Sequence, residues 1–79
     1  MNDEDKFFST KDFYLACFLK VKNVRLVKTT KEDNIATFHF EKVEDIAKLI
    51  TDFYNNVESV SAIDFINSIR DLKALIHNI

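Results

Sequence analysis

The chain contains no glycine and no proline in 79 residues. Glycine lacks a Cβ atom, so it readily adopts a positive φ and lets the backbone approach a ligand closely. Phosphate-cradling loops, dinucleotide-binding turns and nucleophile elbows all depend on that property. The sequence therefore excludes these classes of site.

Side chains that bind metals are few and far apart in the sequence. The chain has one cysteine, Cys17, and two histidines, His39 and His77. A structural zinc site takes four cysteine or histidine ligands at close spacing, which this sequence does not offer. Calcium loops need clustered oxygen ligands and a glycine for their sharp turn. We therefore expect no metal and no cofactor.

The candidates for catalytic chemistry are equally sparse. His39 and Glu41 fall on one face of a predicted strand, where a histidine and a carboxylate can work as an acid/base pair. Neither His39 nor His77 has a nucleophile at a recognisable spacing. Cys17 lies in an apolar segment, so its thiol is expected to have a raised pKa and to be inert. We predict no catalytic residue and no enzyme activity.

The length and the hydrophobic content predict a single small domain. The composition is 47% hydrophobic with eight phenylalanines, which is enough for one core. A core of this size stabilises a fold by only about 3–5 kcal/mol, and a partner subunit is the one remaining support when disulfides and metals are absent. We assign residues 1–79 to one domain and expect the acidic segment 1–6 to be disordered.

Three features of the sequence favour a cytoplasmic protein. A lone cysteine in an apolar segment fits a reducing compartment. The acidic start, residues 2–5, lacks the basic and apolar regions of a secretory signal. No apolar run approaches the ~18–20 residues that are needed to span a bilayer, so we expect no membrane association.

The apolar periodicity predicts an α+β fold in the order β-α-β-β-α-α, with a two- or three-stranded antiparallel sheet packed against helices. The predicted elements are a brief strand at 7–8, a helix over 13–21, strands at 24–30 and 35–41, a helix over 43–55 and a helix from 61 to the end. The two central strands form a hairpin. Because glycine is absent, we expect a loose turn of three to five residues with Asp33 or Asn34 at a positive φ.

Capping and alternation refine these elements. Ser9 or Thr10 is the expected N-cap of the first helix, and Ser61 is the expected start of the last. On the hairpin, Phe38 and Phe40 point to the core, while strict alternation places Thr29 on the opposite, half-polar face. The predicted core consists of Phe13, Leu15, Ala16, Leu19, Leu26, Phe38, Phe40, Ile46, Ile50, Phe53, Phe65, Ile69 and Leu72.

The helix over 13–21 is apolar nearly all round, with Lys20 as its only charged residue. Such a helix either lies between a sheet and other helices or presents one side to another subunit. The last helix also carries an apolar stripe, which Ile66 and Leu75 widen. The candidate partner-interface residues are Tyr14, Phe18, Ile66, Leu75 and Ile79.

Charge is sorted along the chain, although the net charge is only −2. Residues 11–31 hold six basic residues and one acidic residue, whereas residues 32–79 hold nine acidic and four basic residues. A dipolar chain of this kind meets an anion with one side, or meets a copy of itself. The candidate anion or nucleic-acid contacts are Lys20, Lys22, Arg25, Lys28 and Lys31.

Several segments together resemble one known family. They are Phe8-Ser9-Thr10-Lys11-Asp12 followed by Tyr14-Leu15-Ala16 and Phe18-Leu19, the strand Phe38-His39-Phe40-Glu41, and the ending Phe65 with Ile69-Arg70-Asp71-Leu72-Lys73. The chain is similar over nearly its whole length to the small prokaryotic and phage family called domain of unknown function 5659. The resemblance implies a prokaryotic or viral origin and a βαββαα order. It implies no known activity and transfers no catalytic residue.

Two functions remain open from the sequence. The favoured one is a non-catalytic protein-interaction module, a homodimer or an adaptor or inhibitor of a host machine, that acts through an apolar helix face. The alternative is a nucleic-acid-binding accessory protein that uses the basic stretch 20–31, although the net negative charge of the chain argues against it. No small-molecule substrate is evident from the sequence.

Overall fold

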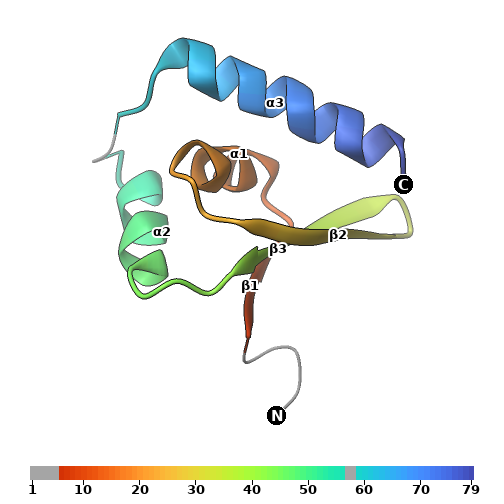
Figure 1. Ribbon diagram of the computed structural model, residues 1–79, viewed down its shortest axis with the longest axis horizontal. Helices are drawn as coiled ribbons and strands as arrows, with labels where there is room; N and C mark the ends of the chain where they lie inside the picture. Colours follow the sequence, from red (N-terminus) through yellow and green to blue (C-terminus); the bar gives the residue numbers. More distant parts are fainter. Residues whose placement is uncertain (1–5, 57–58) are drawn as a thin grey trace.

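The computed structural model describes residues 6–56 and 59–79, and it confirms the α+β class and the predicted element order (Figure 1). The elements are β1 (Phe7–Thr10), α1 (Phe13–Val21), β2 (Leu26–Glu32), β3 (Ile35–Glu41), α2 (Ile46–Tyr54) and α3 (Ala62–His77). The expected disorder of segment 1–6 falls, apart from Lys6, outside the described residues. Compared with the prediction, α2 begins three residues later.

The sheet has three antiparallel strands in the order β1-β3-β2, so β3 is central. Phe40 on β3 pairs with Phe8 on one side and Leu26 on the other. A bulge between Leu26 and Lys28 shifts the register, and Thr29 therefore comes to lie opposite the inward-facing Phe38. The alternation predicted the opposite face for Thr29, and this prediction is wrong because the bulge inserts one extra residue.

The hairpin turn is tighter than predicted. Glu32 pairs directly with Ile35, so Asp33 and Asn34 alone form the turn, with φ values of 52° and 65°. A two-residue turn with positive φ at both positions matches the twist of the flanking strands, and aspartate and asparagine tolerate that conformation. The expected loop of three to five residues is wrong, whereas the expected positive φ at these residues is confirmed.

Helix starts were predicted with mixed success. Asp12, and not Ser9 or Thr10, caps α1: its Oδ1 accepts a hydrogen bond from the Leu15 amide at 3.1 Å. The reason is that β1 continues to Thr10, which delays the start of the helix. Ser61 caps α3 as predicted, with its Oγ accepting from the Asp64 amide at 3.3 Å.

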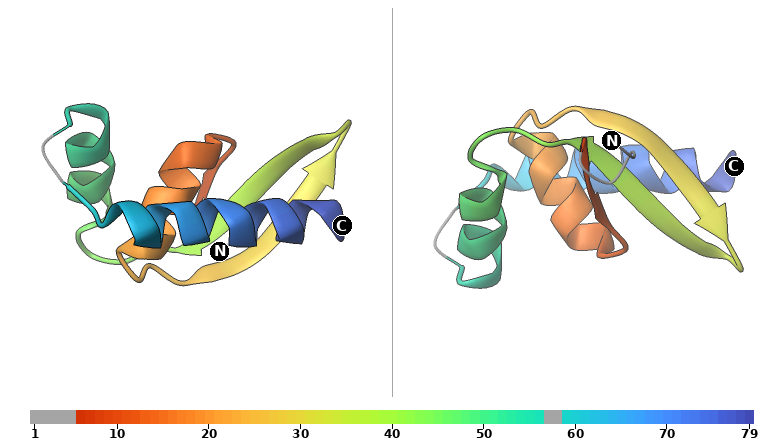
Figure 2. Two further views of the ribbon diagram at one scale, coloured as in Figure 1. Left: turned by 90° about the horizontal axis from the view of Figure 1, so that it is seen from above. Right: turned by 90° about the horizontal axis from the view of Figure 1, so that it is seen from below.

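Helices α1 and α3 lie on one side of the sheet, with α1 between the sheet and α3, while α2 lies beside α1 at one end of the molecule (Figures 1 and 2). This position explains the apolar composition of α1, which is buried from Leu15 through Leu19. Seven of the thirteen predicted core residues are buried and the other six are half-buried, so the predicted core is correct in outline. The buried residues that the prediction missed are Cys17, Phe18, Val24 and Ser68.

Phe18 was a candidate interface residue, and that prediction is wrong. Its side chain is only 3% exposed. Phe53 of α2 packs on it with the ring centroids 5.1 Å apart, and the Lys22 ammonium lies 5.6 Å from its ring. The helix that follows the hairpin thus covers the side of α1 that the sequence left open.

Candidate functional site

A surface formed by α1 and α3 presents exposed aromatic and aliphatic side chains. Tyr14, in the first turn of α1, is 58% exposed and stacks on Phe65 of α3, with the ring centroids 6.5 Å apart and the planes 15° from parallel. Ile66, the next residue on α3, is 53% exposed. We call Tyr14, Phe65 and Ile66 the aromatic surface. Exposed apolar groups that are contiguous across two elements are typical of contact sites.

A buried hydrogen bond fixes the position of this surface. The Ser68 hydroxyl donates a buried hydrogen bond of 3.1 Å to the Cys17 carbonyl, which joins α3 to α1. Tyr14 lies one turn before Cys17, and Phe65 lies one turn before Ser68, so the two rings meet on the same side of that contact. Figure 2 shows α1 crossing beneath α3. The aromatic surface is therefore held by the core.

A further exposed aromatic residue lies near the start of α1. The Tyr54 hydroxyl, in the last turn of α2, donates to Oδ2 of Asp12 at 2.7 Å. That hydrogen bond raises the pKa of Tyr54. Tyr54 follows the apolar spacing of α2, yet its ring is exposed. Tyr54 lies in the last turn of α2, where neighbouring elements no longer cover the helix. This position was the one feature of the sequence that indicated an exposed ring.

The other candidate interface residues do not join the aromatic surface. Leu75 is half-buried against the core. Ile79 is exposed, but it lies after the C-terminal end of α3, whereas Phe65 and Ile66 lie near the beginning of that helix. Of the five predicted interface residues, Tyr14 packs on Phe65, and Ile66, the next residue on α3, is exposed.

The basic candidates are divided between the two faces of the sheet. Lys28 pairs with His39 on the face away from the helices, and its ammonium lies 5.5 Å from the ring centroid of Phe7. Lys31 pairs with Ala36, which lies two positions before the inward-facing Phe38 and therefore shares its face. The two lysines thus point to opposite sides of the hairpin.

The remaining basic candidates lie near the end of α1. Lys22 is at the C-terminal cap of α1, over the Phe18 ring. Arg25 is exposed before β2, and Lys20 faces the acidic side of α3. The five predicted anion contacts therefore form no single basic surface. Lys20 and Lys22 lie at the end of α1, whereas the bulge and the alternation of β2 turn Lys28 and Lys31 to opposite faces.

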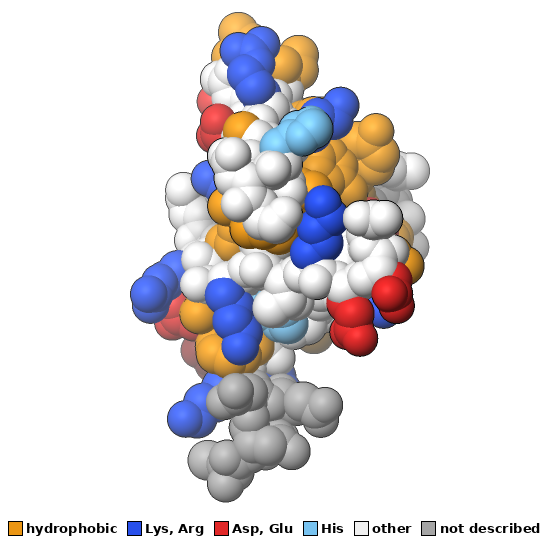
Figure 3. Space-filling view, turned by 90° about the vertical axis from the view of Figure 1, so that its right-hand side faces the viewer, with side chains coloured by type: hydrophobic (Ala, Val, Ile, Leu, Met, Phe, Trp, Pro, Cys, Tyr) orange, Lys and Arg blue, Asp and Glu red, His pale blue; other side chains and the backbone are white. Residues whose placement is uncertain are grey.

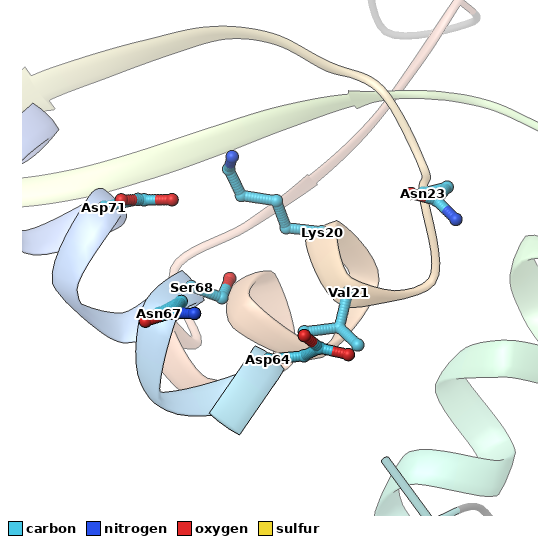
Figure 4. Close-up of a pocket in the computed structure, with 7 residues that line it drawn as sticks. All are labelled: Lys20, Val21, Asn23, Asp64, Asn67, Ser68 and Asp71. Carbon is cyan, nitrogen blue, oxygen red and sulfur yellow. The ribbon is translucent and has the colours of Figure 1, made fainter. Parts of the chain in front are cut away.

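A polar groove separates the end of α1 from α3 (Figure 4). Its volume is about 350 Å³, and its lining includes Lys20, Asn23, Asp64, Asn67 and Asp71. One ammonium faces two carboxylates, so the lining carries one excess negative charge and does not favour an anion. Among the described residues no three metal-ligating side chains converge on a common point, in this groove or elsewhere.

His39 makes different contacts from those predicted. Its Nδ1 lies 2.7 Å from the Ser9 hydroxyl on β1, and its Nε2 lies 2.9 Å from the Thr30 hydroxyl on β2. Both ring nitrogens are therefore occupied, by Ser9 and Thr30 and not by Glu41. Burial, and secondarily the nearby Lys28 ammonium, lowers the pKa of His39. The imidazole links the three strands in its neutral form.

This arrangement predicts a pH dependence of stability. Because the pKa of His39 is lower in the folded state than the ordinary 6.5, the unfolded chain binds more protons just below that pH. The contribution of His39 to the free energy of unfolding is complete above about pH 6.5 and is lost as the pH falls through the folded pKa. Urea unfolding at pH 7.5 and pH 5.5 measures this change. The variant His39→Gln should lose part of the decline, and an unchanged decline would contradict the assignment.

Cys17 is buried and uninvolved in any candidate chemistry. Burial raises the pKa of its thiol to about 11, against a smaller lowering effect from Ser68. The thiolate is the reactive form of cysteine, so this thiol is inert at neutral pH, as predicted.

Comparisons with known proteins complete the description. No curated protein and no solved structure is significantly similar to this chain. Within residues 6–56 and 59–79, no helix combines the length and the apolar character that a membrane crossing requires. Residues 5–78 match the family described as Domain of unknown function (DUF5659), and the chain therefore belongs to that family, as its sequence motifs predicted.

Proposed function

We propose that the chain is a non-catalytic protein-interaction module whose aromatic surface docks onto a protein partner. One observation carries this proposal: Tyr14 is stacked on Phe65 and yet more than half exposed, and Ile66, which follows Phe65 on α3, is exposed as well. Tyrosine is among the residues that contribute most to binding at protein interfaces.

The geometry favours binding for two reasons. The stack on Phe65 and the core below it restrict the Tyr14 ring before binding, so little conformational entropy is lost when a partner covers it. The tyrosine hydroxyl also keeps a polar group at the edge of an apolar contact, where it can bond to a partner or to water.

The proposal extends to the setting in which the module acts. A second copy of the chain is the first partner to test, because a domain of this size gains stability from a subunit that covers apolar surface. A cytoplasmic location agrees with the buried free thiol of Cys17. An adaptor or inhibitor from a phage or mobile element remains part of the proposal.

The alternative, a nucleic-acid-binding accessory protein that uses residues 20–31, has less support. Binding to a polyanion needs several cations on one surface. Lys28 and Lys31 lie on opposite faces of the hairpin, and Lys20 faces the carboxylates of α3.

Sedimentation equilibrium tests the proposal with one variant on α1 and one on α3, and with a matched control on α3. We expect wild-type self-association to weaken at least about tenfold in Tyr14→Ala and in Ile66→Ala, because central contacts at interfaces exceed ~1 kcal/mol each. The control is Ile63→Ala, which removes an equally large side chain that is 71% exposed outside the aromatic surface. Its association should match the wild type.

A second measurement tests for a partner that is a different protein and not a copy of the chain. A photo-crosslinking residue at position 66, but not at position 63, should form covalent adducts with the partner in cells. The absence of adducts from position 66, together with a monomeric wild type at high concentration, would contradict the proposed function.

A further inference from the structure

The end of α3 and the tip of the hairpin border an open basic hollow that is separate from the aromatic surface. Its volume is about 450 Å³, and it is lined by Lys31 of β2 and by Lys73, Ile76 and His77 of α3. We propose that this basic hollow binds the phosphate group of a small phosphorylated molecule.

The charge of the hollow is uniform. Three of its four lining side chains are basic, and no acidic residue lines it. Glu32 and Asp33 follow Lys31 directly, but they line a different hollow together with Lys11. Successive residues of a strand point to opposite faces, and this alternation separates Lys31 from Glu32. Figure 3 shows this end of the molecule, where basic side chains and histidine lie next to hydrophobic surface and acidic side chains also lie on the same face.

The two lysine cations of the hollow are not neutralised within the described part of the chain. Neither Lys31 nor Lys73 forms an ion pair with any residue in 6–56 or 59–79. The C-terminal end of a helix dipole favours cations, which accounts for His77 in the last turn of α3. It does not account for Lys31, which a separate element brings to the same hollow. A bound dianion would relieve the repulsion between these like charges.

The size and lining indicate the class of ligand. Small-molecule sites commonly occupy about 300–1,000 Å³ and combine apolar walls with a few charged groups. Lysine ammonium groups bind phosphate as point charges, and a phosphate offers several acceptor oxygens to donors from different directions. Ile76 supplies an apolar wall for the organic part of a phosphate ester.

The test is a titration of the full chain with inorganic phosphate, followed by amide chemical shifts in NMR, against sodium chloride at the same ionic strength. We expect saturable shifts at Lys31, Lys73, Ile76 and His77 that chloride does not reproduce. The double variant Lys31→Gln/Lys73→Gln should weaken phosphate binding by at least about tenfold. The reason is that hydrogen bonds between charged groups are stronger than those between neutral groups.

The matched control is Lys28→Gln, which removes the same charge from the same strand on the opposite face. It should bind phosphate as the wild type does. Shifts that do not saturate, shifts that chloride reproduces, or equal losses in Lys28→Gln and in the double variant would each overturn the proposal. Retained amide dispersion in all three proteins verifies that they are folded.

Discussion

Replacing Phe38 with alanine is expected to lower the free energy of unfolding by about 3–5 kcal/mol, which is enough to unfold so small a domain. Phe38 lies on the central strand, is 1% exposed and packs against Phe13 with ring centroids 6.2 Å apart. Truncation leaves a cavity between the sheet and the helices that neighbouring groups fill only in part. Circular dichroism during urea titration measures the loss.

The control lies on the same strand. Ile35 is exposed at the start of β3, beside the turn. Ile35→Ala should cost well under about 1.5 kcal/mol, since it removes no core packing. A Phe38→Ala variant that unfolds cooperatively near the wild-type melting temperature would refute the assigned core.

The fold was predictable because periodicity and capping agree along most of the chain. Alternation around Phe38 and Phe40 identified a strand with one buried face, and that face packs against the helices. The absence of glycine also proved informative. Asparagine takes the left-handed conformation at Asn23 and Asn56, where α1 and α2 end, so asparagine does the work that glycine usually does.

The bulge in β2 could not be predicted from the sequence, because it depends on packing between strands. The bulge before Lys28 depends on how β2 fits the twist of β3, and no local motif announces it. It brings the Thr29 hydroxyl into the interior, where this hydroxyl has no hydrogen-bond partner among the described residues. Strict alternation cannot anticipate such a shift, because one inserted residue reverses every later side chain.

The candidate site was partly predictable for a related reason. Tyr14 and Ile66 are separated by 52 positions, and each was recognised as an apolar residue on a helix that needs cover. Tyr14 meets Phe65, the neighbour of Ile66, because α1 and α3 cross, and the buried contact between Ser68 and Cys17 fixes that crossing. The prediction failed for Phe18 because the sequence did not reveal which side of α1 would be covered by α2.

The attachment of α3 gives the other large expected effect. Leu72 is 1% exposed, and it belongs to the core cluster that contains most of α1. We expect Leu72→Ala to lower the free energy of unfolding by about 2–5 kcal/mol. Leu75→Ala, one turn later and only half-buried, is the matched control and should lose clearly less.

The way in which Leu72→Ala unfolds shows whether α3 belongs to one cooperative core or unfolds as a separate unit. Because α1 packs on the sheet with one side and on α3 with another, the loss of α3 would expose a helix that has almost no polar face. Leu72→Ala should therefore unfold in a single transition, and the amides of β3 and α3 should lose protection from hydrogen exchange together. If β3 stays protected while α3 exchanges freely, α3 unfolds as a separate unit, and the aromatic surface that it forms with α1 would then not be held by the core.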